Sequence, residues 1–280
     1  MSVRRILHLS DLHFGPPYLP DVGESALRTA GELDPDVVVV SGDLTQRAKR
    51  SQFEEARAFL ERLPDVPTVV VPGNHDVPLW RVWERMTRPH ELYREHVSEN
   101  LDGVLRLDGA TIVWLDSTSP RRAISNGRIH LEQLAFCREA LADTDPADLR
   151  IVVAHHHFLP APDFERDVAM PRARRALETF VELRVDMILG GHLHRGYIGH
   201  TLDVWAGADR EHGIVIVQCG TTTSRRGRGR EREKNTFNLV EVAPDRDRFT
   251  VTHYAHFADV GGFEPMSRHE FPRPRRRSLA

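Results

Sequence analysis

Five short segments carry side chains that can bind metal ions or transfer protons, and each directly follows an apolar run or a turn after one. They are Asp11-Leu12-His13, Gly42-Asp43, Asn74-His75-Asp76, His155 and His192-Leu193-His194. Carboxylate, imidazole and carboxamide groups together suit divalent ions such as Mn²⁺, Fe²⁺ or Zn²⁺. None of the segments contains cysteine, which argues against a structural zinc site. The candidate ligands are too many for one ion and sufficient for two.

The charge of such a site favours phosphoester chemistry. Two divalent ions carry four positive charges, and Asp11, Asp43 and a bridging hydroxide would return three. The remaining positive charge would attract a phosphoester and stabilise its transition state. In two-metal sites about 3.5–4 Å across, the ions clamp the attacking and leaving oxygens and lower the pKa of the bound water. The sequence has no Gly-rich loop ending in Lys-Ser or Lys-Thr, so P-loop binding of a nucleoside triphosphate is not expected.

Residue spacing indicates how the side chains could converge. Successive side chains of an extended chain point to opposite faces, so Asp11 and His13 share a side while Leu12 packs on the other. His192 and His194 share a side for the same reason.

Strands and helices alternate along most of the chain. Strands are predicted at residues 4–9, 37–40 and 68–71, and helices at 24–33 and 50–63. The four valines at 37–40 are typical of a strand in a sheet that is covered on both faces. This order predicts a layered α/β fold with its site at the carboxyl edge of the strands.

The second half continues this pattern and then changes. A hairpin is predicted around Asp108-Gly109, and the further elements are helices near 131–141 and 172–183 and strands at 150–154 and 185–189. From residue 201 onward helical periodicity is lost. Strands are expected there at 201–205, 213–218, 236–242 and 249–254, adding a second sheet to the same core.

The chain is expected to form one domain over residues 1–265. Residues 77–101 follow the third segment directly and are rich in Trp, Arg, His and Glu. They could form a cap insertion or one wall of the site, and a surface helix pair is an equal alternative. Residues 266–280 end in a Pro/Arg-rich tail that is expected to be disordered.

Composition excludes several classes of protein. The chain has 280 residues, only two cysteines and a formal net charge of −3. No run approaches the roughly 18 apolar residues of a membrane span, and the two distant cysteines fit a reducing compartment. A cytoplasmic protein without a membrane partner is therefore expected. The near-neutral charge does not favour nucleic acid as a partner.

The five segments, in this order and spacing, resemble the calcineurin-like metallophosphoesterase family over residues 6–194. Asp116-Ser117, Gly127 and Glu132-Gln133-Leu134 resemble more loosely its class III cyclic-nucleotide phosphodiesterase branch. The resemblance implies a four-layer α/β/β/α sandwich with two mixed β-sheets and a dinuclear metal site at the carboxyl edge of the strands.

The resemblance also implies a role for each matched residue. One ion would be held by Asp11, His13, Asp43 and His194. Asp43 would bridge to the second ion, which Asn74, His155 and His192 would complete. The metal-bridging hydroxide would attack the phosphorus in line.

Two further residues would assist this attack. His75 would lie over the phosphate, as general acid to the leaving group or as a charge stabiliser. Asp76 could orient the His75 ring through its other nitrogen.

The run His155-His156-His157-Phe158 departs from the branch, in which prolines usually follow the histidine pair. We take His155 as the ligand because it comes first after the strand. His157 would point the same way, and His156 is assigned to the pocket wall or to a supporting layer.

The predicted function is hydrolysis of a phosphodiester, such as a cyclic nucleotide or another small diester. A nuclease or DNA-repair phosphodiesterase is an alternative, motivated by arginines at 225–234 and in the tail. A phosphomonoesterase, including a phosphoprotein phosphatase, is another, because a metal pair serves both reactions. A scaffold without activity is disfavoured by the complete ligand set. The oligomeric state is open, with a homodimer as one option.

Overall fold

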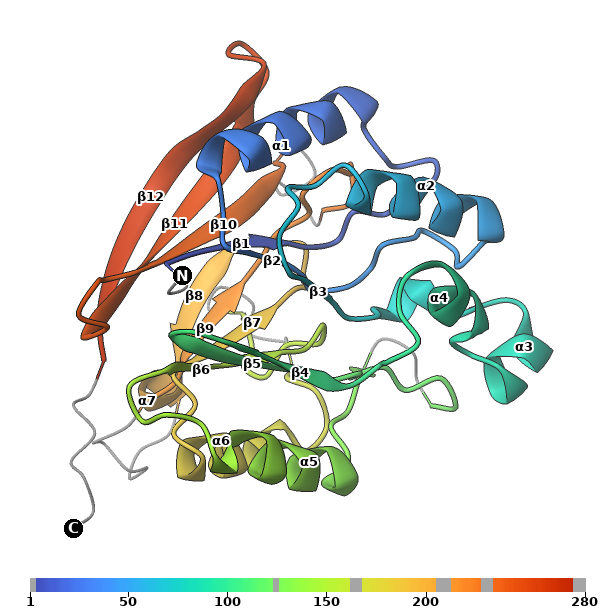
Figure 1. Ribbon diagram of the computed structural model, residues 1–280. Helices are drawn as coiled ribbons and strands as arrows, with labels where there is room; N and C mark the ends of the chain where they lie inside the picture. The colour runs from blue at the N-terminus through green and yellow to red at the C-terminus, as the bar shows by residue number, and fades with distance from the viewer. Residues whose placement is uncertain (1–3, 123–125, 162–167, 205–212, 228–233, 274–280) are drawn as a thin grey trace.

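The computed structural model describes residues 4–122, 126–161, 168–204, 213–227 and 234–273. Two six-stranded sheets pack face to face (Figure 1). The first sheet has the order β12 (Gly262–Pro272), β11 (Arg248–Phe257), β10 (Thr236–Val242), β1 (Arg5–Leu9), β2 (Val37–Val40) and β3 (Thr68–Val70). The second has the order β4 (Gly103–Leu107), β5 (Ala110–Trp114), β6 (Leu149–Val153), β7 (Met187–Gly190), β9 (Val215–Gln218) and β8 (Tyr197–His200).

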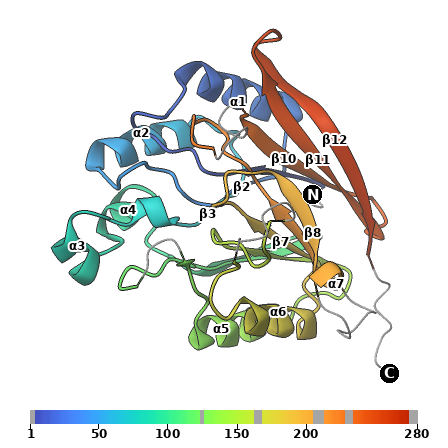
Figure 2. The same ribbon diagram turned by 180° about the vertical axis from the view of Figure 1, so that it is seen from behind.

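Helices cover the outer face of each sheet. α1 (Pro20–Leu33) and α2 (Arg50–Leu60) lie on the first sheet, while α5 (Leu131–Ala142) and α6 (Ala173–Glu182) lie on the second (Figures 1 and 2). Three large apolar clusters fill the spaces between these four layers. The α/β/β/α sandwich with two mixed sheets is therefore confirmed.

The valines of β2 show why this sheet is covered on both faces. Val38 and Val40 pack in the cluster under α1 and α2, and Val37 and Val39 pack between the two sheets. All four side chains are fully buried. A strand apolar on both sides is stable only where both of its faces are removed from water.

The late strands divide between the sheets, so the prediction that they add a second sheet of their own is wrong. β10 pairs antiparallel with β1, with Leu239 opposite Leu7, and β11 and β12 extend the first sheet from there. β8 and β9 join the second sheet beside β7. The pairing covers the edge of β1 that β2 leaves open.

Three boundaries also differ from expectation. Residues 201–204 form a short helix, α7 (Thr201–Val204), and the strand comes just before it as β8. α1 begins at Pro20, a residue suited to the first turn of a helix. β12 continues to Pro272, paired with β11, so residues 266–272 belong to the domain. Of the rest of the expected tail, Arg273 pairs with Asp186 at 3.1 Å, and residues 274–280 lie outside the described residues.

Residues 77–101 form two short helices, α3 (Val82–Thr87) and α4 (Glu91–His96), beside the carboxyl edge of the sheets (Figure 1). The buried Tyr93 anchors α4, because its hydroxyl donates to Val70 O at 2.9 Å. Trp80 and Trp83 are largely exposed. Across the described chain, no helix is both long and apolar enough to span a membrane.

Candidate metal centre

The five segments follow β1, β2, β3, β6 and β7, and their side chains meet at one edge of the sandwich. Five of the expected ligands have left-handed backbones: φ is 53° at Asp11, 52° at His13, 52° at Asp43, 73° at His192 and 53° at His194. These are half of the ten such non-glycine residues among those described. Strained backbone of this kind concentrates at functional sites. The left-handed turns, rather than an extended chain, bring Asp11 and His13 together.

The first cluster contains Asp11, His13, Asp43 and His194. The Nε2 atom of His194 lies 3.1 Å from Asp11 Oδ1 and 3.0 Å from His13 Nε2. His13 Nε2 lies 3.7 Å from Asp43 Oδ2. One candidate ligand atom from each residue falls within 4.8 Å of the others. The four residues predicted to bind one ion therefore lie together in the structure.

The second cluster gathers around Asn74. Its Oδ1 atom lies 2.8 Å from His192 Nδ1 and 3.2 Å from His155 Nε2. His155 Nε2 also lies 3.4 Å from Asp43 Oδ1. The two carboxylate oxygens of Asp43 thus face different clusters, as a bridging ligand requires.

Two buried oxygens test whether cations fit here. Asp11 Oδ1 and Asp43 Oδ2 have no hydrogen-bond partner within the described part of the chain. A buried carboxylate without a partner is costly unless a cation neutralises it. The nearby nitrogens belong to imidazoles, which bind divalent ions when neutral. The donor set therefore fits a pair of divalent ions.

The protonation states of Asp43 and His13 agree with this assignment. Burial alone would raise the pKa of Asp43, but His155, His75 and His13 hold that pKa well below its usual range. Burial lowers the pKa of His13 to about 4, against the opposing effect of Asp11. Asp43 is thus ionised and His13 neutral at neutral pH, which are the forms that bind metals. Burial alone would lower the pKa of His155, but Asp43 raises it to about 9, so this ring must lose a proton to bind an ion.

His75 is held over the first cluster without belonging to it. Its Nδ1–H donates to Gln46 O at 2.9 Å, and its backbone N–H donates to Asp43 Oδ1 at 2.8 Å. Its ring stands edge-on to His13, with 4.9 Å between the ring centroids. Because Nδ1 is engaged by a carbonyl, Nε2 is the nitrogen available to a substrate.

The expectation that Asp76 orients this ring is wrong. Its carboxylate accepts the backbone N–H groups of Leu44, Thr45 and Gly73 at 3.1, 2.8 and 2.9 Å. It therefore ties the loop after β2 to the turn after β3, while Gln46 O holds the His75 ring. Burial, together with the neighbouring Asp43, raises the pKa of Asp76 to about 7.

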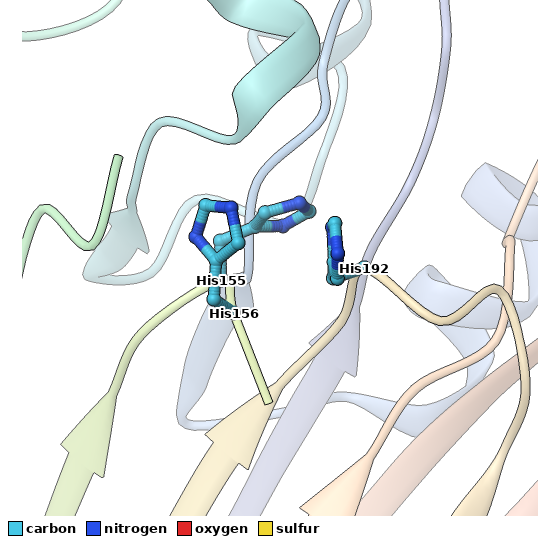
Figure 3. A group of neighbouring side chains, drawn as sticks. All are labelled: His155, His156 and His192. Carbon is cyan, nitrogen blue, oxygen red and sulfur yellow. The ribbon is translucent and has the colours of Figure 1, made fainter. Parts of the chain in front are cut away.

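The three consecutive histidines after β6 have different partners. His155 donates through Nδ1 to Ser41 O at 2.8 Å, which directs Nε2 to the second cluster. Nδ1 of His156 lies 2.9 Å from Ser117 Oγ, and Nε2 of His157 donates to Val168 O at 3.1 Å. Figure 3 shows the rings of His155, His156 and His192 gathered close together, edge-on or tilted to one another. His156 thus lies against the second cluster but is held by Ser117.

Several supporting residues were not singled out in the sequence. Thr221 Oγ1 donates to Asp11 O at 2.7 Å and Thr223 Oγ1 to Leu12 O at 2.8 Å. Ser10 Oγ donates to Asp11 Oδ2 at 2.7 Å. The detectable signal is the run Thr221-Thr222-Thr223-Ser224, which is fully buried although every side chain is polar. Such a run must find hydrogen bonds.

Two glycines allow this close packing. A Cβ atom at Gly73 would lie 2.2 Å from Asp43 Oδ1, and one at Gly191 would lie 2.0 Å from Ser10 Oγ. Both contacts are too short for any side chain. The glycines before Asn74 and His192 are therefore part of the site.

A family model described as calcineurin-like phosphoesterase matches residues 4–196. The chain belongs to this family. A cAMP/cGMP dual specificity phosphodiesterase of Mycobacterium tuberculosis is 28% identical over 301 residues, covering 98% of this chain and 85% of the relative. A probable cyclic nucleotide phosphodiesterase of Rhodococcus erythropolis is 30% identical over 203 residues, covering 68% of this chain and 64% of the relative. Membership of the family makes the chain a phosphoric ester hydrolase by class.

Among solved structures, a purple acid phosphatase from yellow lupin seeds superposes with a TM-score of 0.74. The sequences are 16% identical, and the alignment covers 98% of this chain and 55% of the lupin protein. At this identity the likeness concerns the fold alone. It agrees with the two-sheet architecture described above.

Proposed function

We propose that this chain is a dinuclear-metal-dependent phosphodiesterase that acts on a cyclic nucleotide or another small diester. The observation that carries the proposal is the placement of Asp43 between two sets of ligand atoms, with Oδ2 toward His13 and Oδ1 toward His155. The names of the two relatives support the diester preference. Mn²⁺, Fe²⁺ and Zn²⁺ are the ions that suit the donors.

The chain's own residues have separate tasks in this proposal. Asp11, His13, Asp43 and His194 would hold one ion, and Asp43, Asn74, His155 and His192 the other. A bound pair of ions supplies an activated water and neutralises phosphate charge. His75, with Nδ1–H donated to Gln46 O, would present Nε2 to the leaving oxygen and donate a proton from it in the doubly protonated form of the ring. Asp76 would act only through the backbone that carries these groups.

The test compares bis-p-nitrophenyl phosphate with p-nitrophenyl phosphate in the presence of Mn²⁺. We expect Mn²⁺-stimulated hydrolysis with the higher kcat/KM on the diester, and loss of both activities in Asp43→Ala. An Asp65→Ala variant, which changes an exposed carboxylate, serves as the control. Full activity of Asp43→Ala with unchanged metal content would refute the mechanism. A higher kcat/KM on the monoester would replace the diesterase with a phosphomonoesterase.

A further inference from the structure

A cavity of about 460 Å³ lies beside the metal centre, between the loop after β5 and the segment that carries α4. Its lining includes Leu101, Asp116, Thr118, Arg122 and Arg128, and none of the expected metal ligands. Cavities of this size commonly bind small molecules. The residues expected to form a cap thus contribute a wall, through Pro89, His90 and Leu101, to a second site.

Part of this lining is cationic and poorly compensated. Arg121, Arg122 and Arg128 all contribute to it, and none forms an ion pair with a carboxylate of the described residues. The Nε atom of Arg128 is buried and has no hydrogen-bond partner among them. Burial lowers the pKa of Arg128, the charges of Arg172 and Arg122 lower it further, and Glu132 opposes them. The half-buried Arg128 side chain thus has one buried donor, Nε, without an acceptor among the described residues, which favours binding of an anion.

Another part of the lining is a fixed polar wall. His90 Nε2 lies 2.9 Å from Thr118 Oγ1 and 3.4 Å from Asp116 Oδ2. Thr118 N–H donates to Asp116 Oδ1 at 2.8 Å, and Asp116 N–H donates to Asp102 Oδ1 at 2.7 Å. This network holds the wall in place and keeps carboxylate and hydroxyl oxygens beside the cavity. Leu101 and Pro120 add apolar surface.

The loop that carries Arg128 also touches the metal centre. Arg128 N–H donates to Ser117 O at 2.8 Å, and Ser117 Oγ lies 2.9 Å from His156 Nδ1. A Cβ atom at Gly127 would lie 2.2 Å from His156 Cγ, so this loop packs tightly on the histidine. The cavity lining is therefore connected to the second cluster through Ser117 and His156.

We propose that this cavity binds a phosphate-bearing organic molecule of nucleotide size. Arg122 and Arg128 hold its phosphate, and Leu101 and Pro120 contact its apolar body. The molecule is a free nucleotide that binds beside the metal centre, because the phosphate of a substrate would have to lie at the metal ions and not on Arg122 and Arg128. Binding here does not depend on hydrolysis, so a failure of the proposed activity leaves this inference standing.

The test is calorimetric titration of the full chain with adenosine 5′-monophosphate, with adenosine as the probe that lacks phosphate. Variants Arg128→Ala and Arg122→Glu remove the cationic contacts, and Arg128→Lys retains the charge. Arg57→Ala, which changes an exposed arginine on α2, is the matched control. We expect at least tenfold weaker binding in the first two variants, partial recovery with lysine and wild-type binding in the control.

Hydrogen exchange locates the bound nucleotide. We expect protection of residues 116–122 and 126–133 in the wild type and its loss in Arg128→Ala. Equal affinity in wild type and Arg128→Ala, or protection confined to the segments after β1, β2 and β3, would overturn the proposal.

Kinetics distinguishes a free nucleotide from part of a substrate. If the nucleotide binds as a free effector, its non-competitive inhibition of bis-p-nitrophenyl phosphate hydrolysis disappears in Arg128→Ala. If Arg128→Ala instead raises KM for cyclic AMP and leaves the inhibition by adenosine 5′-monophosphate unchanged, the cavity holds part of the substrate and the free-nucleotide proposal is overturned. Unchanged inhibition together with unchanged KM values would contradict the proposal.

Discussion

The Nε2 atoms of His13 and His194 lie 3.0 Å apart, although the residues are 181 positions apart in the chain. Both nitrogens also lie within 3.7 Å of Asp11 Oδ1. Two basic nitrogens at this distance, aimed at one buried carboxylate, are arranged for a shared cation.

Replacement of His194 by Gln should therefore remove one metal ion. The reason is that the first cluster loses a nitrogen ligand while the second keeps its own donors. Metal analysis of the purified chain is expected to give about one equivalent less than the wild type. His256→Gln, on β11, is the control and should retain the wild-type content. Two full equivalents in the His194 variant would contradict the ligand assignment.

His75→Asn tests proton donation to the leaving group. General acid catalysis typically contributes about 10²–10⁴-fold, and the contribution grows as the leaving group becomes more basic. We expect a large loss of kcat on an alkyl diester and a much smaller loss on a p-nitrophenyl diester, with metal content unchanged. Equal losses on both substrates would assign His75 to charge stabilisation instead.

Asp76→Asn should reduce stability more than catalysis. The amide cannot accept all of the backbone N–H donors that now reach the carboxylate, and one buried unpaired donor costs about 1–3 kcal/mol. Urea unfolding should show this loss in the free energy of unfolding. The control Asp65→Asn, which changes an exposed carboxylate, should show no loss. A lower kcat of Asp76→Asn at unchanged stability would instead indicate that Asp76 orients His75.

Asp76 also shows where the sequence stops being informative. The convergence of the candidate ligands could be predicted because each lies shortly after an apolar strand, and parallel strands bring their carboxyl ends to one edge. Two of the three backbone partners of Asp76, Leu44 and Thr45, could not be predicted, because they are about 30 residues away and only the folded chain brings them near.

The same limit applies to the sheets. The strand β10 was predicted, but its place beside β1 depends on which edge is open and not on local composition. Residues 201–204 contain Thr and Val and favour a strand, yet they form a helix in the structure. The left-handed backbone at Asp11 and His13 was likewise not predicted, although Asp and His adopt it more often than most residues.

Arg226→Ala should weaken substrate binding. The segment before Arg226 is hydrogen-bonded to the loop after β1 through Thr221 and Thr223. The charge of Arg226 acts on His75. Burial, the larger cause, and this charge both lower the pKa of His75. We expect KM to rise about fivefold to tenfold, the size of one partly exposed charge-assisted hydrogen bond. Arg225→Ala, which changes the exposed neighbouring residue, is the control. Equal KM values in the two variants would refute the predicted contact between Arg226 and the substrate.

A buried chain of polar groups behind the metal centre should make stability depend on pH. His8 Nε2 lies 2.9 Å from Ser41 Oγ, and Asn238 connects His8 with His253 across β1, β10 and β11. Burial lowers the pKa of His8 to about 3 and that of His253 to about 4, from 6.5. Between pH 6.5 and these values the unfolded chain binds protons that the folded chain does not. Stability therefore falls as pH falls through this window, by up to about 1.4 kcal/mol per pH unit for each histidine.

Urea unfolding between pH 7 and 5 measures this slope, with chelator present so that metal release does not contribute. His253→Gln should flatten the slope relative to the wild type, because one depressed pKa value is removed. His130→Gln should retain it, since that exposed ring lies outside the chain of hydrogen bonds. An identical slope in all three proteins would mean that the pH dependence of folding arises elsewhere, in carboxylates that titrate over the same range.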